Sequence, residues 1–217
     1  MEMRHPYRRI DMETWKRRHH YEVFGRGEYP YIGLTTTLDV SGFLEACREG
    51  GDKFFNAFLY VVTRAMNAVE NFRYRVFEDQ VVVCDVVDPS FNVMNRETEL
   101  FYFAYAEYDA DFRKFDAEVE WAKDKALRTN NLGGNRLDVM YVSCLPWFGF
   151  TDIIQPMGLS AGDTIPRLVW GKFGEEGGRT TMPFSITGHH GMFDGLHISQ
   201  LLDGMERLMA DPSFLRK

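Results

Sequence analysis

The residues best suited to acid–base chemistry gather in one stretch of ten, GHHGMFDGLH, which runs from Gly188 to His197. It holds three of the six histidines of the chain, together with Asp194. Histidine is the commonest general base because its ordinary pKa, about 6.5, lies close to working pH. The hydrophobic pattern predicts that a strand ends and a helix begins here, and such a junction holds a side chain in a fixed position. The stretch is therefore a candidate catalytic site.

Other roles remain open for the same residues. Each histidine could be structural, and Asp194 could cap the closing helix. His190, Asp194 and His197 stand at i, i+4 and i+7, so a helix that began at His190 would present three metal ligands on one face. The three glycines of the stretch favour a turn instead. We therefore predict no metal site.

The elements that hold this site can be predicted from the period of the apolar residues. Spacings of three and four predict helices, and alternation predicts strands. Helices are expected from Asp11, over 41–50, over 53–69, from Phe112 to Ala126 and from Ile198 to Leu208. Strands are expected over 31–38, 73–77, 80–87, 91–95, 100–108, 138–143, 147–151, 166–173 and 183–187, with Glu78 and Asp79 as a hairpin turn. The strands come in adjacent runs, which favours an α/β fold of the α+β two-layer type, a mixed β-sheet with helices mainly on one face.

Composition narrows the class of protein. The 217 residues are 45% hydrophobic and carry a net charge of −7, which indicates one globular domain over residues 1–217 and argues against a nucleic-acid-binding protein. The three cysteines are widely spaced and suggest neither disulfides nor zinc, and Cys144 has no activating neighbour. No apolar run predicts a signal peptide or a membrane span. We expect a cytoplasmic protein without membrane partners.

Several motifs resemble those of the chloramphenicol acetyltransferase family. The segment from His189 to His197 is similar to that family's active-site signature, HHxxxDGxH. Other matching motifs follow in the family's order, at Trp15–Arg18, Lys53–Phe55, Asp88–Phe91, Glu97–Phe101, Ser143–Trp147 and Pro166–Phe173. Dihydrolipoyl acyltransferases carry a related HxxxDG, but the sequence has neither a lipoyl domain nor a linker. The resemblance implies the CoA-dependent acyltransferase fold, antibiotic inactivation by acetyl transfer, and acetyl-CoA as the co-substrate.

The resemblance also implies roles for single residues. His190 is the general base, which takes the proton of an acceptor hydroxyl as that hydroxyl attacks the thioester carbonyl of acetyl-CoA directly in a ternary complex. Asp194 forms an ion pair with Arg17, which fixes the backbone of the catalytic turn. Ser143 donates a hydrogen bond to the oxyanion of the tetrahedral intermediate. His189 packs against its surroundings or holds the turn.

The family's coenzyme site can be carried over in the same way. Lys53 and Lys172 match positions near the adenosine phosphates of CoA, and Lys53 also opens a helix whose first N–H groups favour an anion. Phe55 and Trp147 match residues that line the pantetheine channel. A chain of net charge −7 must gather positive charge locally to bind these phosphates.

The acceptor pocket is where the match loosens. Its expected lining residues are largely apolar, and they are Val23, Phe24, Ile32, Ser90, Asn92 and Phe101. Val169 stands where family members often carry a threonine. The resemblance implies chloramphenicol as the acceptor, bound at the subunit interfaces of a homotrimer. Two alternatives stay open, namely the same chemistry on another small hydroxyl compound and a non-catalytic binding protein that retains the fold.

Overall fold

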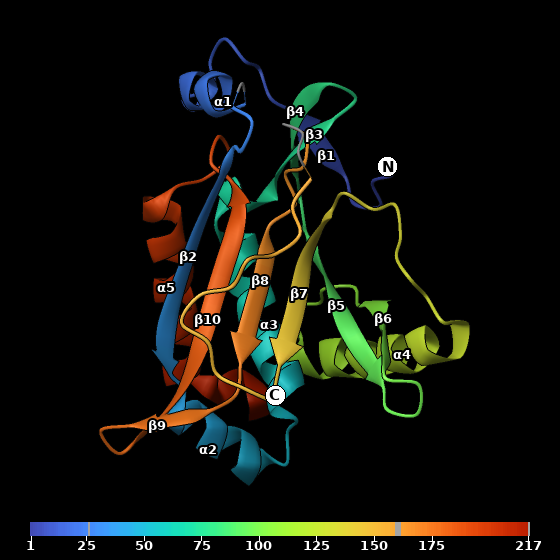
Figure 1. The fold of residues 1–217 in the computed structure, drawn as a ribbon, viewed down its shortest axis with the longest axis vertical. Coiled ribbons are helices and arrows are strands. Elements are labelled where there is room, and N and C mark those ends of the chain that lie inside the picture. The colour runs from blue at the N-terminus through green and yellow to red at the C-terminus, as the bar shows by residue number, and fades with distance from the viewer. Residues whose placement is uncertain (26, 159–161, 217) are drawn as a thin grey trace.

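A seven-stranded mixed sheet forms the centre of the computed structural model, which describes residues 1–25, 27–158 and 162–216. The strand order is β2-β10-β8-β7-β5-β6, and β9 pairs with β10 at one end (Figure 1). The strands are β2 (Tyr31–Asp39), β5 (Asp88–Asn95), β6 (Leu100–Tyr105), β7 (Val139–Leu145), β8 (Arg167–Gly171), β9 (Gly174–Glu176) and β10 (Arg179–His189). Only the two pairs that contain β7 are parallel among the described pairings.

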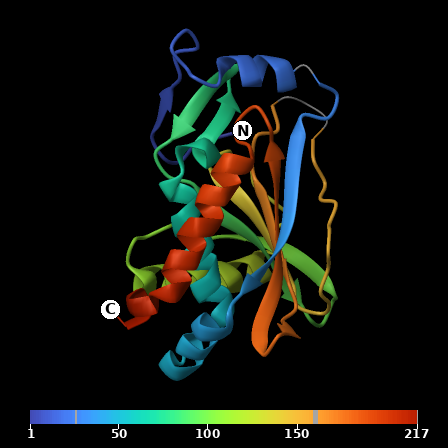
Figure 2. The ribbon, with the colours of Figure 1, turned by 90° about the vertical axis from the view of Figure 1, so that its left-hand side faces the viewer.

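Four helices cover one face of this sheet, as Figure 2 shows from the side. They are α2 (Ser41–Gly50), α3 (Phe54–Ala68), α4 (Phe112–Thr129) and α5 (Gly195–Ala210). The short helix α1 (Arg18–Phe24) lies apart from them, at the end of the sheet where β10 finishes. Helix α3 is buried along most of its length, because its apolar residues face the sheet on one side and α5 on the other. The predicted two-layer α/β architecture is confirmed.

Local sequence signals explain several element ends. Asp111 caps α4 by accepting from two backbone N–H groups of its first turn. Gly51 caps the C-terminal end of α2, and its φ of 71° is a left-handed conformation that glycine adopts without strain. Glu78 and Asp79 both have positive φ and join β3 (Tyr74–Phe77) to β4 (Gln80–Cys84) in a two-residue turn, which confirms the predicted hairpin.

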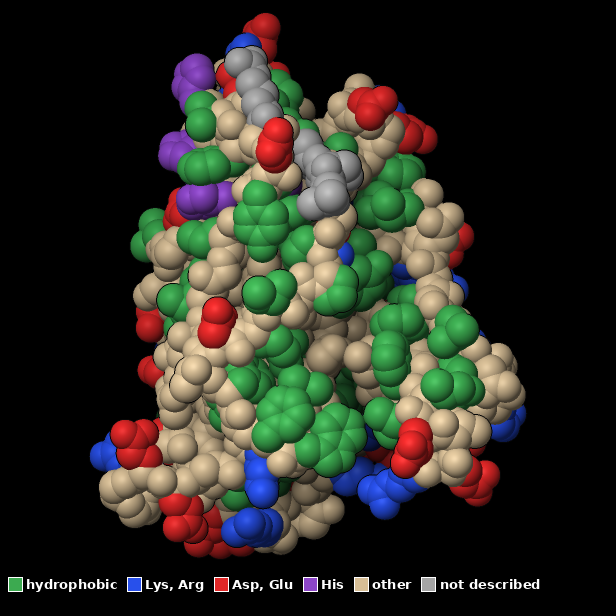
Figure 3. Space-filling model, in the orientation of Figure 1, with side chains coloured by type: hydrophobic (Ala, Val, Ile, Leu, Met, Phe, Trp, Pro, Cys, Tyr) green, Lys and Arg blue, Asp and Glu red, His purple; other side chains and the backbone are tan. Residues whose placement is uncertain are grey.

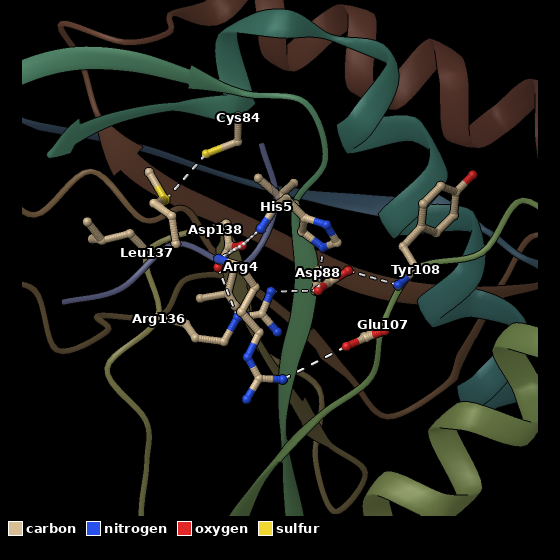
Figure 4. Close-up of polar contacts among 12 residues, drawn as sticks. Arg4, His5, Cys84, Asp88, Glu107, Tyr108, Arg136, Leu137 and Asp138 are labelled. Atoms are coloured by element: carbon tan, nitrogen blue, oxygen red, sulfur yellow. Dashed lines mark hydrogen bonds and ion pairs between the residues drawn. The ribbon is translucent and has the colours of Figure 1, made fainter. Parts of the chain in front are cut away.

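A second sheet and a buried ion cluster tie the start of the chain to the main sheet. Strand β1 (Tyr7–Arg9) pairs with β4 to form the order β1-β4-β3. Just before β1, His5 lies 2.8 Å from Asp88 at the start of β5 (Figure 4). Arg136 bonds the same carboxylate at 2.7 Å and Asp138 at 2.9 Å, and Asp138 also accepts the backbone N–H groups of Arg4 and His5. Asp88 and Asp138 are fully buried, so these contacts replace the water that both carboxylates lose.

The His5 contact predicts a pH-dependent contribution to stability. The hydrogen bond to Asp88 raises the pKa of His5, although partial burial opposes the shift. A raised folded-state pKa means that the contact stabilises most below the unfolded pKa of about 6.5 and weakens as pH rises through the folded value. Urea unfolding should show wild type more stable than His5→Gln by about 1.5–3 kcal/mol at pH 5.5, with a smaller gap at pH 9. An equal gap at both pH values would contradict this assignment.

Two predicted elements are wrong and two strands were not foreseen. Residues 147–151 form no strand, because they belong to the segment between β7 and β8 that crosses the sheet face rather than pairing within it. The helix expected from Asp11 begins only at Arg18, and Asp11 instead accepts backbone and side-chain hydrogen bonds within a tight turn. Strands β1 and β9, of three residues each, are too short to give a period. Two 3₁₀ turns, Glu70–Arg73 and Pro212–Arg216, complete the elements described.

Within the described residues, no helix has both the length and the apolar composition that a membrane crossing requires.

Candidate active site

His190 lies in the turn between β10 and α5, at the predicted junction. Its half-buried ring packs on the ring of Phe24, with 3.9 Å between centroids. The Nδ1 atom lies 3.1 Å from the carbonyl oxygen of Phe193. Because a carbonyl oxygen only accepts, Nδ1 carries the proton of the neutral ring and Nε2 keeps its lone pair. This is the tautomer that can take a proton at Nε2.

Arg17 fastens the turn that carries His190. Its buried guanidinium donates to the carbonyl oxygens of Gly191 (3.1 Å) and His190 (3.0 Å), and to a carboxylate oxygen of Asp194 (2.7 Å). Burial is the largest single influence on Asp194 and opposes its ionisation, but the hydrogen bond from Arg17, the charges of His197 and Arg17 and the N–H of Leu196 together lower the pKa of that carboxyl to about 2. Asp194 also caps α5 by accepting from the N–H of Leu196. The pair therefore acts on the backbone around the histidine rather than on its ring.

His189 holds the same turn from the inside. It is fully buried, and its Nδ1 accepts the N–H of Gly191 at 3.0 Å. Burial lowers the pKa of this ring to about 4, so it is neutral at pH 7. Its position and contacts fit the structural role expected for the first histidine of the pair.

Ser143 lies in β7, on the sheet face opposite to the helices, since its neighbour Val142 points into the core. Across the β7–β8 pairing it faces Val169, a buried aliphatic side chain. From the other side, the amide nitrogen of Asn92 donates to the Ser143 Oγ over 3.0 Å. Burial raises the pKa of the adjacent Cys144 to about 11, so that its thiol remains protonated and is a poor nucleophile.

Two grooves meet at Asn92. One, of about 690 Å³, is lined by Phe55 and Trp147, the residues expected to contact pantetheine, and also by Lys123. The other, of about 520 Å³, is lined by three of the residues expected to bind the acceptor, Ser90, Asn92 and Phe101, and by Ser143. A substrate in one groove could thus be reached from the other at the Ser143 hydroxyl.

The two lysines expected near the coenzyme lie at the same end of the molecule. Lys53 precedes α3 and Lys172 follows β8, and their chain neighbours Phe54 and Phe173 touch edge to face with 4.9 Å between ring centroids. Both lysines are exposed, and Lys53 forms an ion pair with Glu120. Figure 3 shows Lys and Arg side chains gathered along this lower edge, below a patch of apolar ones.

The remaining expected acceptor residues lie elsewhere on the chain. Val23 and Phe24 belong to α1, where Phe24 packs on His190, and Ile32 belongs to β2, where it is the register partner of Gly188 in β10, away from Ser143 in β7. Ser143 and Ser185 are both register partners of Val169, so they lie at the same level of the sheet, two strands apart. His190 follows Ser185 by five residues, which corresponds to about 17 Å along β10 in addition to about 10 Å across the strands. Within one chain, His190 and Ser143 therefore do not meet.

The structure adds residues that sequence reasoning missed. Tyr105, Tyr141 and Arg167 line the groove beside Ser143, and the Arg167 guanidinium lies 5.3 Å from the centre of the Tyr141 ring. Their side chains reach this groove through strand register, which sequence periodicity does not supply. No group of three or more His, Cys, Asp or Glu side chains suited to a metal is found in the part of the chain that the structure describes.

The chain matches the chloramphenicol acetyltransferase family over residues 5–206. It is 30% identical over 205 residues to a chloramphenicol acetyltransferase of a Klebsiella species, and the match covers 93% of each chain. It is 31% identical over 213 residues to chloramphenicol acetyltransferase 2 of Escherichia coli, and that match covers 94% of this chain and 97% of the other. A solved chloramphenicol acetyltransferase superposes with a TM-score of 0.83 at 27% identity, covering 94% of this chain and all of the other. A probable dihydrolipoamide acetyltransferase from Listeria monocytogenes, 16% identical with a TM-score of 0.64 and 94% coverage of both chains, shares the fold.

Proposed function

The chain belongs to the chloramphenicol acetyltransferase family, and on that basis we propose that it transfers the acetyl group of acetyl-CoA to the primary (3-) hydroxyl of chloramphenicol, which inactivates the antibiotic. The observation that carries this proposal is the match along almost the whole chain to enzymes of that name. The arrangement of His190, Arg17 and Asp194 supports it, because it holds a histidine in the tautomer that a general base needs.

We propose direct transfer in a ternary complex. The Nε2 atom of His190 takes the proton of the acceptor hydroxyl while the hydroxyl oxygen attacks the thioester carbonyl. The carbonyl oxygen gains negative charge, which the Ser143 hydroxyl stabilises as a hydrogen-bond donor. The intermediate then collapses, the carbon–sulfur bond breaks, and the protonated histidine returns its proton to the CoA sulfur. No acyl-enzyme forms, and the protonated Cys144 takes no part.

We assign acetyl-CoA to the groove lined by Phe55 and Trp147. Its apolar walls suit the pantetheine arm, which would bring the thioester to the Ser143 end. Lys53 and Lys172, at the outer end, would meet the phosphates. Lys53 also precedes the N-terminus of α3, where unpaired N–H groups favour negative charge.

We propose that two copies of the chain complete each site, as in a homotrimer with three shared sites. The separation of His190 from Ser143 supports this, because the attacking oxygen must contact the base while the oxyanion on the same carbon contacts the serine, which requires the two side chains to face one another across one small site. The uncovered sheet face also exposes apolar side chains, which Figure 3 shows gathered over β5 and β6 and over the segment after β7. Since the edge strand β2 pairs with the late strand β10, we infer that residues 1–217 act as one domain.

The shared site makes a prediction for mixed oligomers. His190→Ala and Ser143→Ala chains should each be nearly inactive alone. The two variants are denatured together in equal amounts and refolded. Random assembly should then restore about a quarter of the wild-type sites, because about half of the sites receive an intact His190 and about half of those also receive an intact Ser143 from the neighbouring chain. Mixing without refolding is the control and should restore little. An unchanged, near-zero rate after refolding would show that both residues must come from one chain.

Release of free thiol from acetyl-CoA tests the acceptor. Chloramphenicol should raise the rate far above the slow background, whereas its 3-deoxy analogue should not, because it lacks the attacked hydroxyl. A rate at background with chloramphenicol would refute the drug assignment. If other alcohols were equally inert, the chain would be a binding protein that keeps the fold.

One observation favours a second acceptor class, small alcohols with more hydrogen-bonding groups than chloramphenicol. The groove beside Ser143 carries two tyrosines and Arg167 on its wall. Ser90 also lines it, and its hydroxyl is buried without a hydrogen-bond partner among the described residues. Buried polar groups of this kind favour ligands that can satisfy them. The same thiol assay with a panel of polyhydroxylated acceptors decides between the two classes by their kcat/KM values.

A further inference from the structure

Asn92 occupies a special place in the proposed active site. It is the residue that lines both the groove assigned to acetyl-CoA and the groove assigned to the acceptor. It was expected from the family resemblance to contact the acceptor. Its amide nitrogen, however, is directed at another protein group, the Ser143 Oγ, at a distance of 3.0 Å. This contact determines what the serine hydroxyl can do.

An amide NH₂ only donates hydrogen bonds, so the Ser143 oxygen must accept the bond from Asn92. The single hydroxyl proton of Ser143 is then not used in this contact and can be donated elsewhere. From this geometry we infer that Asn92 is a positioning residue, which orients the Ser143 hydroxyl so that its proton points to the developing oxyanion. The inference rests on the proposed role of Ser143 as the oxyanion donor.

The other neighbour of Ser143 strengthens the case. Val169 is its register partner in β8, and the exposed fraction of Val169 is 1%. An aliphatic side chain neither donates nor accepts, so it cannot orient a hydroxyl. Where family members often carry a threonine, this chain offers no polar group. The polar group that can orient the Ser143 hydroxyl is therefore the amide of Asn92, on the neighbouring strand β5.

Substitution of Asn92 should change kcat rather than KM, because the hydrogen bond to the oxyanion exists only in the transition state. Asn92→Ala frees the hydroxyl to rotate, and we expect kcat to fall by about 10- to 100-fold, less than the 10²–10³-fold typical for loss of a complete oxyanion donor. Asn92→Asp should be worse than alanine. A carboxylate only accepts, so the serine would donate its proton to Asp and turn away from the oxyanion.

A double-mutant cycle separates positioning from direct acceptor contact. In a Ser143→Ala background, Asn92→Ala should lower kcat no further, because Asn92 acts through the serine. Asn95→Ala is the matched control. It removes the same amide from the same strand, at a residue whose amide oxygen accepts from two backbone N–H groups of the following turn and which lines neither groove, and it should leave kcat unchanged. Thermal unfolding of each variant checks that the fold is intact.

Three results would overturn the inference, namely a raised KM for the acceptor with kcat unchanged, additive losses in the cycle, or an Asp variant more active than the Ala variant. A wild-type chain that does not acetylate chloramphenicol contradicts the proposed acceptor instead, and this is seen before any variant is compared. The cycle is then measured on the slow hydrolysis of acetyl-CoA. That reaction develops the same oxyanion, so the coupling between Asn92 and Ser143 remains measurable.

Discussion

Replacing His190 by alanine is expected to lower the kcat of acetyl transfer by about 10²–10⁴-fold, the usual contribution of a general base. An alcohol is almost entirely protonated at pH 7, so without a base it must attack as the neutral hydroxyl. The bond between Nδ1 and the Phe193 carbonyl holds the lone pair on Nε2, and alanine removes this acceptor for the proton. Initial rates of thiol release at saturating concentrations of both substrates measure the effect.

The controls for this variant are a second histidine and the binding step. His19 lies on α1 with 91% of its side chain exposed, so His19→Ala should retain wild-type kcat. Calorimetry should show that His190→Ala still binds chloramphenicol, since the base acts after binding. If kcat fell less than about threefold, acetyl transfer would not use His190 as its base.

The second large effect concerns stability. Arg136→Met should lower the free energy of unfolding by about 3–5 kcal/mol, because removing one partner of a buried ion pair leaves charge uncompensated. Arg136 bonds Asp88 at 2.7 Å and Asp138 at 2.9 Å, and both carboxylates are fully buried. Methionine fills much of the volume but offers no proton to either oxygen. Urea unfolding at a fixed protein concentration gives the difference, since the apparent stability of the proposed oligomer would depend on concentration.

Arg128→Met is the matched control, as it removes the same side chain from an exposed pair. Its partner Asp124 lies one turn away on α4, and both side chains are 65% exposed. Such pairs contribute about 0–1 kcal/mol. A loss as small for Arg136→Met would mean that water or a shift of the N-terminal segment compensates both carboxylates.

Predictions from the sequence held best where a local pattern decided the structure. The apolar stripe of α3 and the turn at Glu78 and Asp79 depend on neighbouring residues, and both were predicted close to their observed bounds. The order of strands depends on pairings such as β2 with β10, far apart in the chain, and periodicity cannot supply it. Residues 147–151 have a strand-like composition but lie across the sheet, where no strand pairs with them.

The candidate site divides in the same way. The stretch around His190 stands out by composition, and it lies at the junction that the pattern predicts. Arg17 alone looks like a solvated helix residue, and only the family resemblance suggested its partner. The contact between Asn92 and Ser143 depends on which strands are neighbours and on their register. No property of either residue in the sequence indicates it.

The pairing of β2 with β10 has a consequence for the making of this protein. Strand β2 is an edge strand whose only neighbour in the described sheet is β10. The partners of Arg17 likewise lie late in the chain, at residues 190–194. About 140 residues separate the two strands, so at about 5–20 residues per second the ribosome needs about 7–28 s to supply the partner. During that time β2 is an unpaired edge, open to pairing with other nascent chains. The yield of folded protein should therefore depend on chaperone supply and on translation speed, although β2 is fully paired with β10 in the finished sheet.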